Sequence, residues 1–191
     1  MNFLAHIYLS GDDDPLLAIG NCIGDTVRGN QYKEYPEALQ RGILLHRRID
    51  TFTDAHPVFR QSKRRLVPHF NHYAGVIVDI FYDYLLAKHF GEYSPISLHD
   101  FALRFYTSVQ QHWQLLQPEA QHLLHYMLRD NWLERYATVE GITRTFHQMD
   151  ARTDFKSGMQ HAPEVLFAEE EAFEAEFRVF FEEVRGGVKL K

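Results

Sequence analysis

Apolar residues recur every three or four positions along most of the chain, which is the spacing that lets a helix bury one face. The first such segment, residues 16–27, follows Asp14 and Pro15, which suit a helix start, and precedes Gly29, which suits a stop. The same periodicity predicts further helices at about residues 36–51, 54–66, 73–90, 101–109, 123–128, 139–149 and 166–184. No segment alternates as a half-buried strand does, so we predict an all-α fold of about seven or eight helices in one domain, residues 1–191.

Composition and residue counts then narrow the class of protein. The 191 residues are 45% hydrophobic, which suffices for a core, and no apolar run approaches the ~20 residues of a membrane span. The N-terminus lacks the basic and apolar regions of a signal peptide, so we expect a cytoplasmic protein with no membrane partner. Cys22 is the single cysteine, whereas there are twelve histidines. A metal site would therefore consist of imidazole and carboxylate ligands.

Charge is spread unevenly over the chain. The net charge of −6 argues against general binding of nucleic acid. Seven basic residues nevertheless stand against two acidic ones between Arg41 and Arg65, whereas residues 164–185 hold eight glutamates against two arginines. The basic segment is either a solvated helix face or a docking surface for an acidic partner.

Small and polar residues interrupt the first apolar segment. Gly20 and Gly24 are four residues apart, and because glycine costs a helix interior ~1 kcal/mol relative to alanine, the pair indicates a close backbone approach. Asn21 and Asp25 have the same spacing, one position further around the helix. Asp25 is either solvated at a helix end or held at a tight crossing of two helices.

Histidine and aspartate recur at helical spacing in two later segments. His46 and Asp50 share a helix face, so they can reach one divalent cation or form an ordinary hydrogen bond. Asp54 suits a cap of the following helix. Asp79 and Asp83 lie in the most apolar segment, where unpaired carboxylates would cost several kcal/mol and would repel each other. They need a partner, which arginine or a divalent ion could supply.

Six polar residues in apolar surroundings therefore become candidates for one site. They are His6, Asp25, His46, Asp50, Asp79 and Asp83. Taken alone, His6 is either a core histidine or a ligand. Imidazole with carboxylate suits Mn, Fe, Mg or Zn in a hydrolytic site, which activates water and neutralises charge on a phosphate. Arg47 and Arg48 could hold phosphate oxygens.

Four motifs carry a resemblance to a known family. They are MNFLAH at residues 1–6, GN at 20–21 with GDTVRG at 24–29, HRRID at 46–50 with TD at 53–54, and the segment 79–89. The chain resembles the acyl carrier protein phosphodiesterases over essentially its whole length. These enzymes resemble a divergent branch of the HD phosphohydrolases, which implies an HD-like helical bundle.

The resemblance implies a reaction and a substrate. Such enzymes hydrolyse the phosphodiester that joins 4′-phosphopantetheine to a serine of holo acyl carrier protein, and they require Mn²⁺ or Mg²⁺. The adjacent His-Asp pair of the superfamily is missing, because His99-Asp100 begins a later helix. The resemblance therefore implies a ligand set assembled differently, with Asp25 supplying a carboxylate.

The motifs and the polar residues in apolar segments together predict one site. Asp25, His46 and Asp79 form the metal core, and His6 and Asp50 are further ligands or support them. Asp83 orients a ligand or water. We expect Mn²⁺ as the metal, with Mg²⁺ or Fe²⁺ as alternatives. The acidic carrier protein would dock on basic residues, which are Arg28, Arg47, Arg48, Lys63, Arg64 and Arg65.

Two other functions are compatible with the same sequence. The same site could hydrolyse a nucleotide or another small phosphodiester, with the basic segment binding its phosphates. Alternatively, the chain could be a non-enzymatic helical binding protein whose polar core fixes the register of its helices. The oligomeric state is not predicted.

Overall fold

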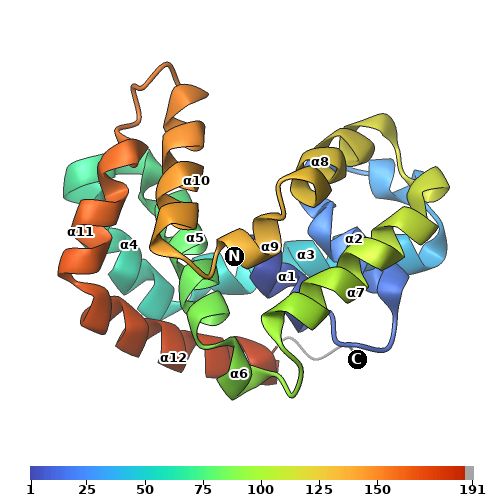
Figure 1. The fold of residues 1–191 in the computed structure, drawn as a ribbon, viewed down its shortest axis with the longest axis horizontal. Coiled ribbons are helices and arrows are strands. Elements are labelled where there is room, and N and C mark those ends of the chain that lie inside the picture. The colour runs from blue at the N-terminus through green and yellow to red at the C-terminus, as the bar shows by residue number, and fades with distance from the viewer. Residues whose placement is uncertain (188–191) are drawn as a thin grey trace.

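The computed structural model describes residues 1–187, and the regular structure of this part of the chain is entirely helical (Figure 1). The α-helices are α1 Phe3–Leu9, α2 Pro15–Cys22, α3 Glu37–Ala55, α4 Pro57–Phe70, α5 Ala74–Lys88, α6 Phe90–Tyr93, α7 Leu98–Gln111, α8 Pro118–Arg129, α9 Trp132–Arg135, α10 Val139–Ala151, α11 Ala162–Ala168 and α12 Glu170–Gly187. The predicted all-α class is confirmed. None of the described helices combines the length and apolar character that crossing a bilayer needs.

The helix count exceeds the prediction for identifiable reasons. Helices α1, α6 and α9 span only four to seven residues, which is too short to show a clear repeat. The predicted helix 166–184 is two helices, α11 and α12, because the backbone leaves helical geometry at Glu169. Asp54 does not cap a helix. Helix α3 continues through it to Ala55, and the break falls at His56, since a residue before proline disfavours helical geometry.

Helix α2 is shorter than predicted, so Asp25 lies beyond its end. The backbone departs from the α-helix at Ile23, and residues Gly24–Thr26 form the 3-10 turn η1. Its start is as expected, because the Asp14 side chain accepts hydrogen bonds from the backbone N–H groups of residues 16 and 17. The turn lifts the Asp25 carboxylate out of the helix and toward α3.

Helices α2 and α3 cross with their backbones in contact. A side chain at Gly20 would overlap the carbonyl oxygen of Leu39, and one at Gly42 would overlap that of Leu17. This confirms the close approach predicted from the glycine spacing. Gly24 serves a different contact, because a side chain there would overlap the imidazole ring of His46. Glycine at these positions therefore lets the main chain of α2 and η1 close over α3.

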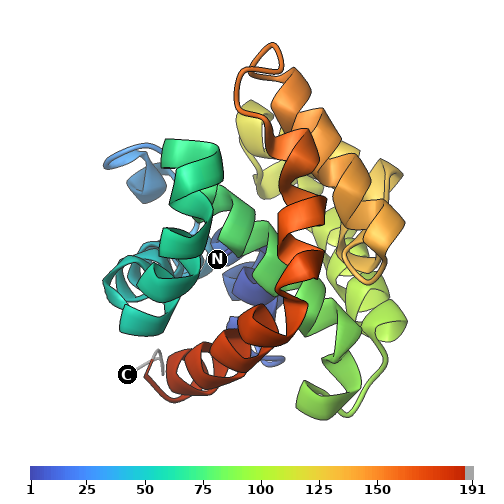
Figure 2. The ribbon, with the colours of Figure 1, turned by 90° about the vertical axis from the view of Figure 1, so that its left-hand side faces the viewer.

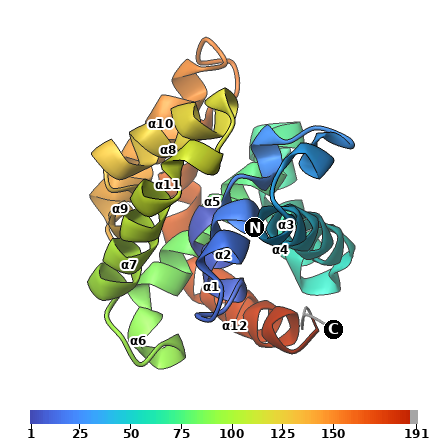
Figure 3. The ribbon, with the colours of Figure 1, turned by 90° about the vertical axis from the view of Figure 1, so that its right-hand side faces the viewer.

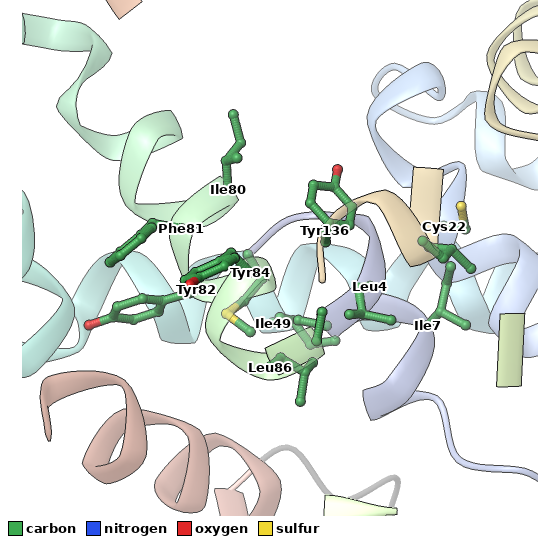
Figure 4. Close-up of a cluster of buried hydrophobic side chains, with 14 of the residues drawn as sticks. Leu4, Ile7, Cys22, Ile49, Ile80, Phe81, Tyr82, Tyr84, Leu86 and Tyr136 are labelled. Carbon is green, nitrogen blue, oxygen red and sulfur yellow. The ribbon is translucent and has the colours of Figure 1, made fainter. Parts of the chain in front are cut away.

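The most apolar helix, α5, forms the centre of the core. Almost every side chain from Ile77 to Ala87 is buried, as expected of a helix that is hydrophobic all round. Helices α1, α4, α10 and α12 pack against it. Figure 4 shows side chains of α1, α3 and α5 meeting in this cluster, together with Tyr136. The candidate site residues His6 and His46 lie on α1 and α3, two of the helices that contribute to this hydrophobic core.

The N-terminus lies near the middle of the molecule (Figures 1, 2 and 3). Helices α3 and α4 lie on one side of it, and α9 and α10 on the other (Figure 3). In Figure 1 the helices α10 and α8 stand apart above α9. Residues from both sides of the molecule can therefore reach a site built around α1.

Candidate active site

Three side chains from α1 and α3 bring their polar atoms together. The Nε2 atom of His6 lies 3.2 Å from Asp50 Oδ1, and that of His46 lies 3.1 Å from Asp50 Oδ2. The two imidazole rings stack with centroids 4.0 Å apart. Each of the three residues offers one potential ligand atom, and these three atoms all lie within 4.8 Å of one another. The three residues therefore form a possible His/Asp metal site, which we call the His–Asp cluster.

A fourth residue, Asp25, closes the solvent side of this cluster. Its Oδ1 lies 3.1 Å from His46 Nε2, while its side chain is 77% exposed. The hydrogen bond from His46 outweighs burial and holds the pKa of Asp25 below its ordinary value. Asp25 is therefore an ionised carboxylate that faces both the cluster and the solvent.

Asn21, a fully buried residue of α2, fixes the direction of both imidazoles. Its Oδ1 accepts a hydrogen bond from His6 Nδ1 at 2.8 Å, and its backbone oxygen accepts one from His46 Nδ1 at 2.7 Å. Its Nδ2 donates to the His6 carbonyl at 2.6 Å, which sets the orientation of the amide. Both Nδ1 atoms consequently carry protons, and both Nε2 atoms point at carboxylates.

The protonation of the two histidines tests whether a cation fits between them. Burial lowers the pKa of His6 to about 4, so its Nε2 presents a lone pair at neutral pH. That atom is buried, has no hydrogen-bond partner among residues 1–187, and faces an oxygen of Asp50. Two electron-rich atoms that face each other in a buried site suit a shared positive ion. The donor set therefore fits a metal.

His46 and Asp50 show the charge that the cluster carries without a cation. Burial lowers the pKa of His46, but hydrogen bonds to Asp25 and Asp50 outweigh it and raise the pKa to about 9. Burial likewise opposes ionisation of Asp50, yet the hydrogen bond from the charged His46 holds the pKa of Asp50 well below the usual range. Two carboxylates thus share one imidazolium. A divalent ion would replace that proton and use the Nε2 lone pairs of both histidines.

Asp79 lies beside the cluster, in a separate ion pair. Its Oδ1 lies 2.8 Å from the α-amino nitrogen of Met1, which in turn lies 3.8 Å from Asp50 Oδ1. Burial raises the pKa of Asp79, and the charge of the Met1 ammonium opposes this shift. The structure therefore does not bring Asp79 to His46, in contrast to the predicted metal core. The α-amino group is a site component that no spacing in the sequence revealed.

Asp83 holds the helix that carries His6. Its two oxygens accept hydrogen bonds from the backbone N–H groups of Leu4 at 2.7 Å and Ala5 at 3.1 Å. Asn2, the N-cap residue of α1, makes no side-chain cap of its own, so Asp83 supplies it from α5. Burial raises the pKa of this carboxyl to about 7. Asp83 thus orients a candidate ligand through the backbone of α1, and within residues 1–187 its carboxylate forms no hydrogen bond with the imidazole.

The predicted basic residues divide into engaged and free side chains. Arg47 donates to the carbonyl oxygens of Val27 at 3.1 Å and Gly29 at 2.7 Å, and so braces the loop after η1. Arg65 pairs with Glu169, which lies between α11 and α12, and with Glu176 of α12. The other four have no salt-bridge partner within residues 1–187. They are Arg28, Arg48 and Arg64, which are exposed, and Lys63, which is half-buried.

Two cavities meet at Asp25. One has a volume of about 570 Å³, and its polar lining includes Arg28, Gln31 and Gln117. The other has a volume of about 210 Å³ and lies between the N-terminus, α9 and α10. The candidate site is therefore accessible from two directions.

Comparison with known proteins gives one consistent result. A model of a family described as acyl carrier protein phosphodiesterase matches residues 1–184. A relative from Enterobacter sp. (strain 638) with the same description is 31% identical over 182 residues, which cover 95% of this chain and 94% of its own. Relatives so described from Yersinia pestis and Serratia proteamaculans (strain 568) are 33% and 34% identical, over 80% of this chain and 79% of theirs. No solved structure matches the chain.

Proposed function

Because the chain belongs to the acyl carrier protein phosphodiesterase family, we propose that it hydrolyses the phosphodiester between 4′-phosphopantetheine and a serine of holo acyl carrier protein. Water attacks phosphorus, the bond from phosphorus to the serine oxygen breaks, and a proton passes to that oxygen. The products are apo carrier protein and 4′-phosphopantetheine. The observation that carries the proposal is the buried His–Asp cluster, whose two Nε2 atoms converge beside the exposed carboxylate of Asp25.

His6, His46 and Asp50 are the proposed metal ligands, with Asp25 as the fourth. A divalent cation held there supplies activation of water and charge for the phosphate oxygens. Two imidazoles with carboxylates suit Mn²⁺ or Fe²⁺ better than Mg²⁺, which prefers oxygen ligands. We propose Mn²⁺ as the metal.

The remaining residues orient the proposed ligands and the attacking water. Asn21 fixes both imidazoles, and Asp83 holds the helix that carries His6. Asp25 Oδ1 faces His46, whereas its Oδ2 has no hydrogen-bond partner within residues 1–187. That oxygen is free to accept a hydrogen bond from the attacking water and then its proton.

The carrier protein, an acidic partner, is proposed to dock beside Asp25. Arg28 lies three residues after Asp25, and Arg48 lies on α3 two residues before Asp50; both are exposed and free of internal salt bridges among the described residues. Arg64 and Lys63 on α4 extend the basic surface. Arg47 supports this surface by holding its loop in place. We propose that the reaction takes place in the cytoplasm.

The test is a change of mass in the carrier protein. Holo carrier incubated with the protein and Mn²⁺ should lose one 4′-phosphopantetheine group, detected by mass spectrometry of the intact carrier. The matched control is the Asp25→Asn variant, which keeps the shape of the side chain but not its charge. An unchanged carrier mass, with metal bound to the wild type, would overturn the proposal. Hydrolysis of a small phosphodiester in the same sample would then favour the small-substrate alternative.

A further inference from the structure

The smaller of the two cavities at Asp25 begins beside the His–Asp cluster. Asp25 lines this cavity of about 210 Å³ and lies 3.1 Å from His46 Nε2. The cavity extends away from the cluster between the N-terminal residues, α8, α9 and α10. A group bound at the cluster therefore has a direct route into it.

The walls of this cavity combine aromatic and aliphatic surface. Phe3 and Trp132 pack with ring centroids 5.6 Å apart, and Val76, Leu123 and Met149 complete the apolar lining. Such a lining suits a ligand with methyl groups and methylene units.

Polar groups sit among these apolar residues. Asn2 Nδ2 donates to the hydroxyl of Tyr136 at 2.9 Å, which orders one wall. Gln148 of α10 and Arg152, the residue that follows this helix, are exposed, and their side chains have no hydrogen-bond partner within residues 1–187. They are free to bind the carbonyl and N–H groups of a ligand. The cavity therefore fits a slender chain that carries both alkyl and amide groups.

We propose that this cavity binds the pantetheine arm of the substrate, an inference that rests on the proposed function. The scissile phosphate carries two substituents, the carrier serine and the arm. Pantetheine is a flexible chain with a dimethyl-substituted carbon, two amides and a terminal thiol, which matches the mixed lining. The larger, polar cavity beside Arg28 is then available for the other substituent of the phosphate, the serine of the carrier protein. Binding the arm positions the phosphorus at the cluster.

The cavity can be tested by filling it from α10. Gln148→Trp places a large ring at its mouth, and Thr143→Trp makes the same change at an exposed position of α10 outside the lining. Free pantetheine is tested as a competitive inhibitor of holo carrier cleavage. We expect Gln148→Trp to raise both the KM for holo carrier and the inhibition constant of pantetheine by about tenfold or more, and Thr143→Trp to raise neither. Arg152→Ala enlarges the site instead of filling it. It should also weaken pantetheine binding and so raise the inhibition constant of pantetheine.

The outcomes separate this inference from the proposed function. A wild type that leaves holo carrier intact contradicts the proposed function, and binding of pantetheine is then measured directly by ligand-observed NMR. Pantetheine that binds wild type and Thr143→Trp, but not Gln148→Trp, supports the cavity in either case. Equal inhibition or equal binding across the wild type, Gln148→Trp and Arg152→Ala would overturn the assignment.

Discussion

His6 and Asn21 hold each other through two hydrogen bonds across a separation of fifteen residues. The His6 Nδ1–H donates to Asn21 Oδ1, and Asn21 Nδ2 donates to the His6 backbone oxygen. The Asn21 backbone oxygen also accepts from His46 Nδ1. One buried residue of α2 thereby sets the tautomer and direction of both imidazoles, which is the role that supporting residues have around metal-binding histidines.

Replacing this amide should weaken metal binding. Asn21→Leu keeps the approximate size of the side chain and removes its hydrogen bonds, so we expect the affinity for Mn²⁺ to fall about 10–100-fold. Isothermal titration of the metal-free protein with Mn²⁺ measures the effect. Ser62→Ala is the control, because Ser62 is equally buried and bonds to Tyr82, outside the site. Unchanged Mn²⁺ affinity in Asn21→Leu would show that the imidazoles need no such support.

Asp50 and Asp79 should respond differently to the same substitution. Asp50 faces both histidines, so Asp50→Asn should lower Mn²⁺ affinity by about 100-fold and abolish turnover. Asp79 pairs with the Met1 ammonium, so Asp79→Asn should mainly lower the melting temperature, because the buried ammonium then keeps only the more distant carboxylate of Asp50, 3.8 Å away. Thermal melts and Mn²⁺ titrations of both variants distinguish the roles. Loss of Mn²⁺ binding in Asp79→Asn with little loss in Asp50→Asn would restore the predicted ligand set.

Helical spacing predicts only part of this site. The relation between His46 and Asp50 follows from one turn of α3, and the close approach at Gly20 follows from the absence of a side chain. His6 lies on a helix of seven residues, too short for a repeat, and reaches the cluster because Asp83 caps that helix from α5. The partner of Asp79 is a backbone amine, which residue types do not reveal. Tertiary packing decides these contacts.

The fold shows the same division between local and tertiary information. Helices α3, α5 and α10 are long and periodic, and their predicted positions agree with the structure to within a few residues. The predicted helix through Val27 is wrong, because Gly24 packs on the ring of His46 and the chain tightens into η1. That contact joins residues far apart in sequence, so periodicity along α2 gives no warning of it. The same departure creates the position of Asp25.

Asp150 should make stability depend on pH. Burial alone would raise its pKa, but hydrogen bonds from Ser157 Oγ at 2.6 Å and from the backbone N–H groups of Gln160 and Gly158 outweigh it and lower the pKa. Since the folded pKa lies below the unfolded value of about 4, this stabilisation is full above pH 4 and is lost as pH falls through the folded pKa. Asp150→Asn should therefore cost about 1–3 kcal/mol at pH 7 and less at pH 3.

Urea denaturation at the two pH values measures this difference. Asp154→Asn is the matched control, since Asp154 lies only four residues further on, in the loop after α10, is 87% exposed and should change the free energy of unfolding little at either pH. A cost for Asp150→Asn that stays equal at pH 7 and pH 3 would mean that the carboxylate charge is not the stabilising feature.

The last prediction concerns docking of the acidic carrier. Arg48 is exposed and free of salt bridges within residues 1–187, whereas Arg65 is paired with Glu169 and Glu176. Arg48→Glu should therefore raise the KM for holo carrier severalfold at low salt and leave the melting temperature unchanged, while Arg65→Glu should lower the melting temperature. Because salt screens exposed charges, the effect of Arg48→Glu should shrink at 0.5 M NaCl. Arg104→Glu on α7 makes the same charge change away from the site, and an equal rise in KM for Arg104→Glu would indicate a general effect of net charge instead of a docking surface.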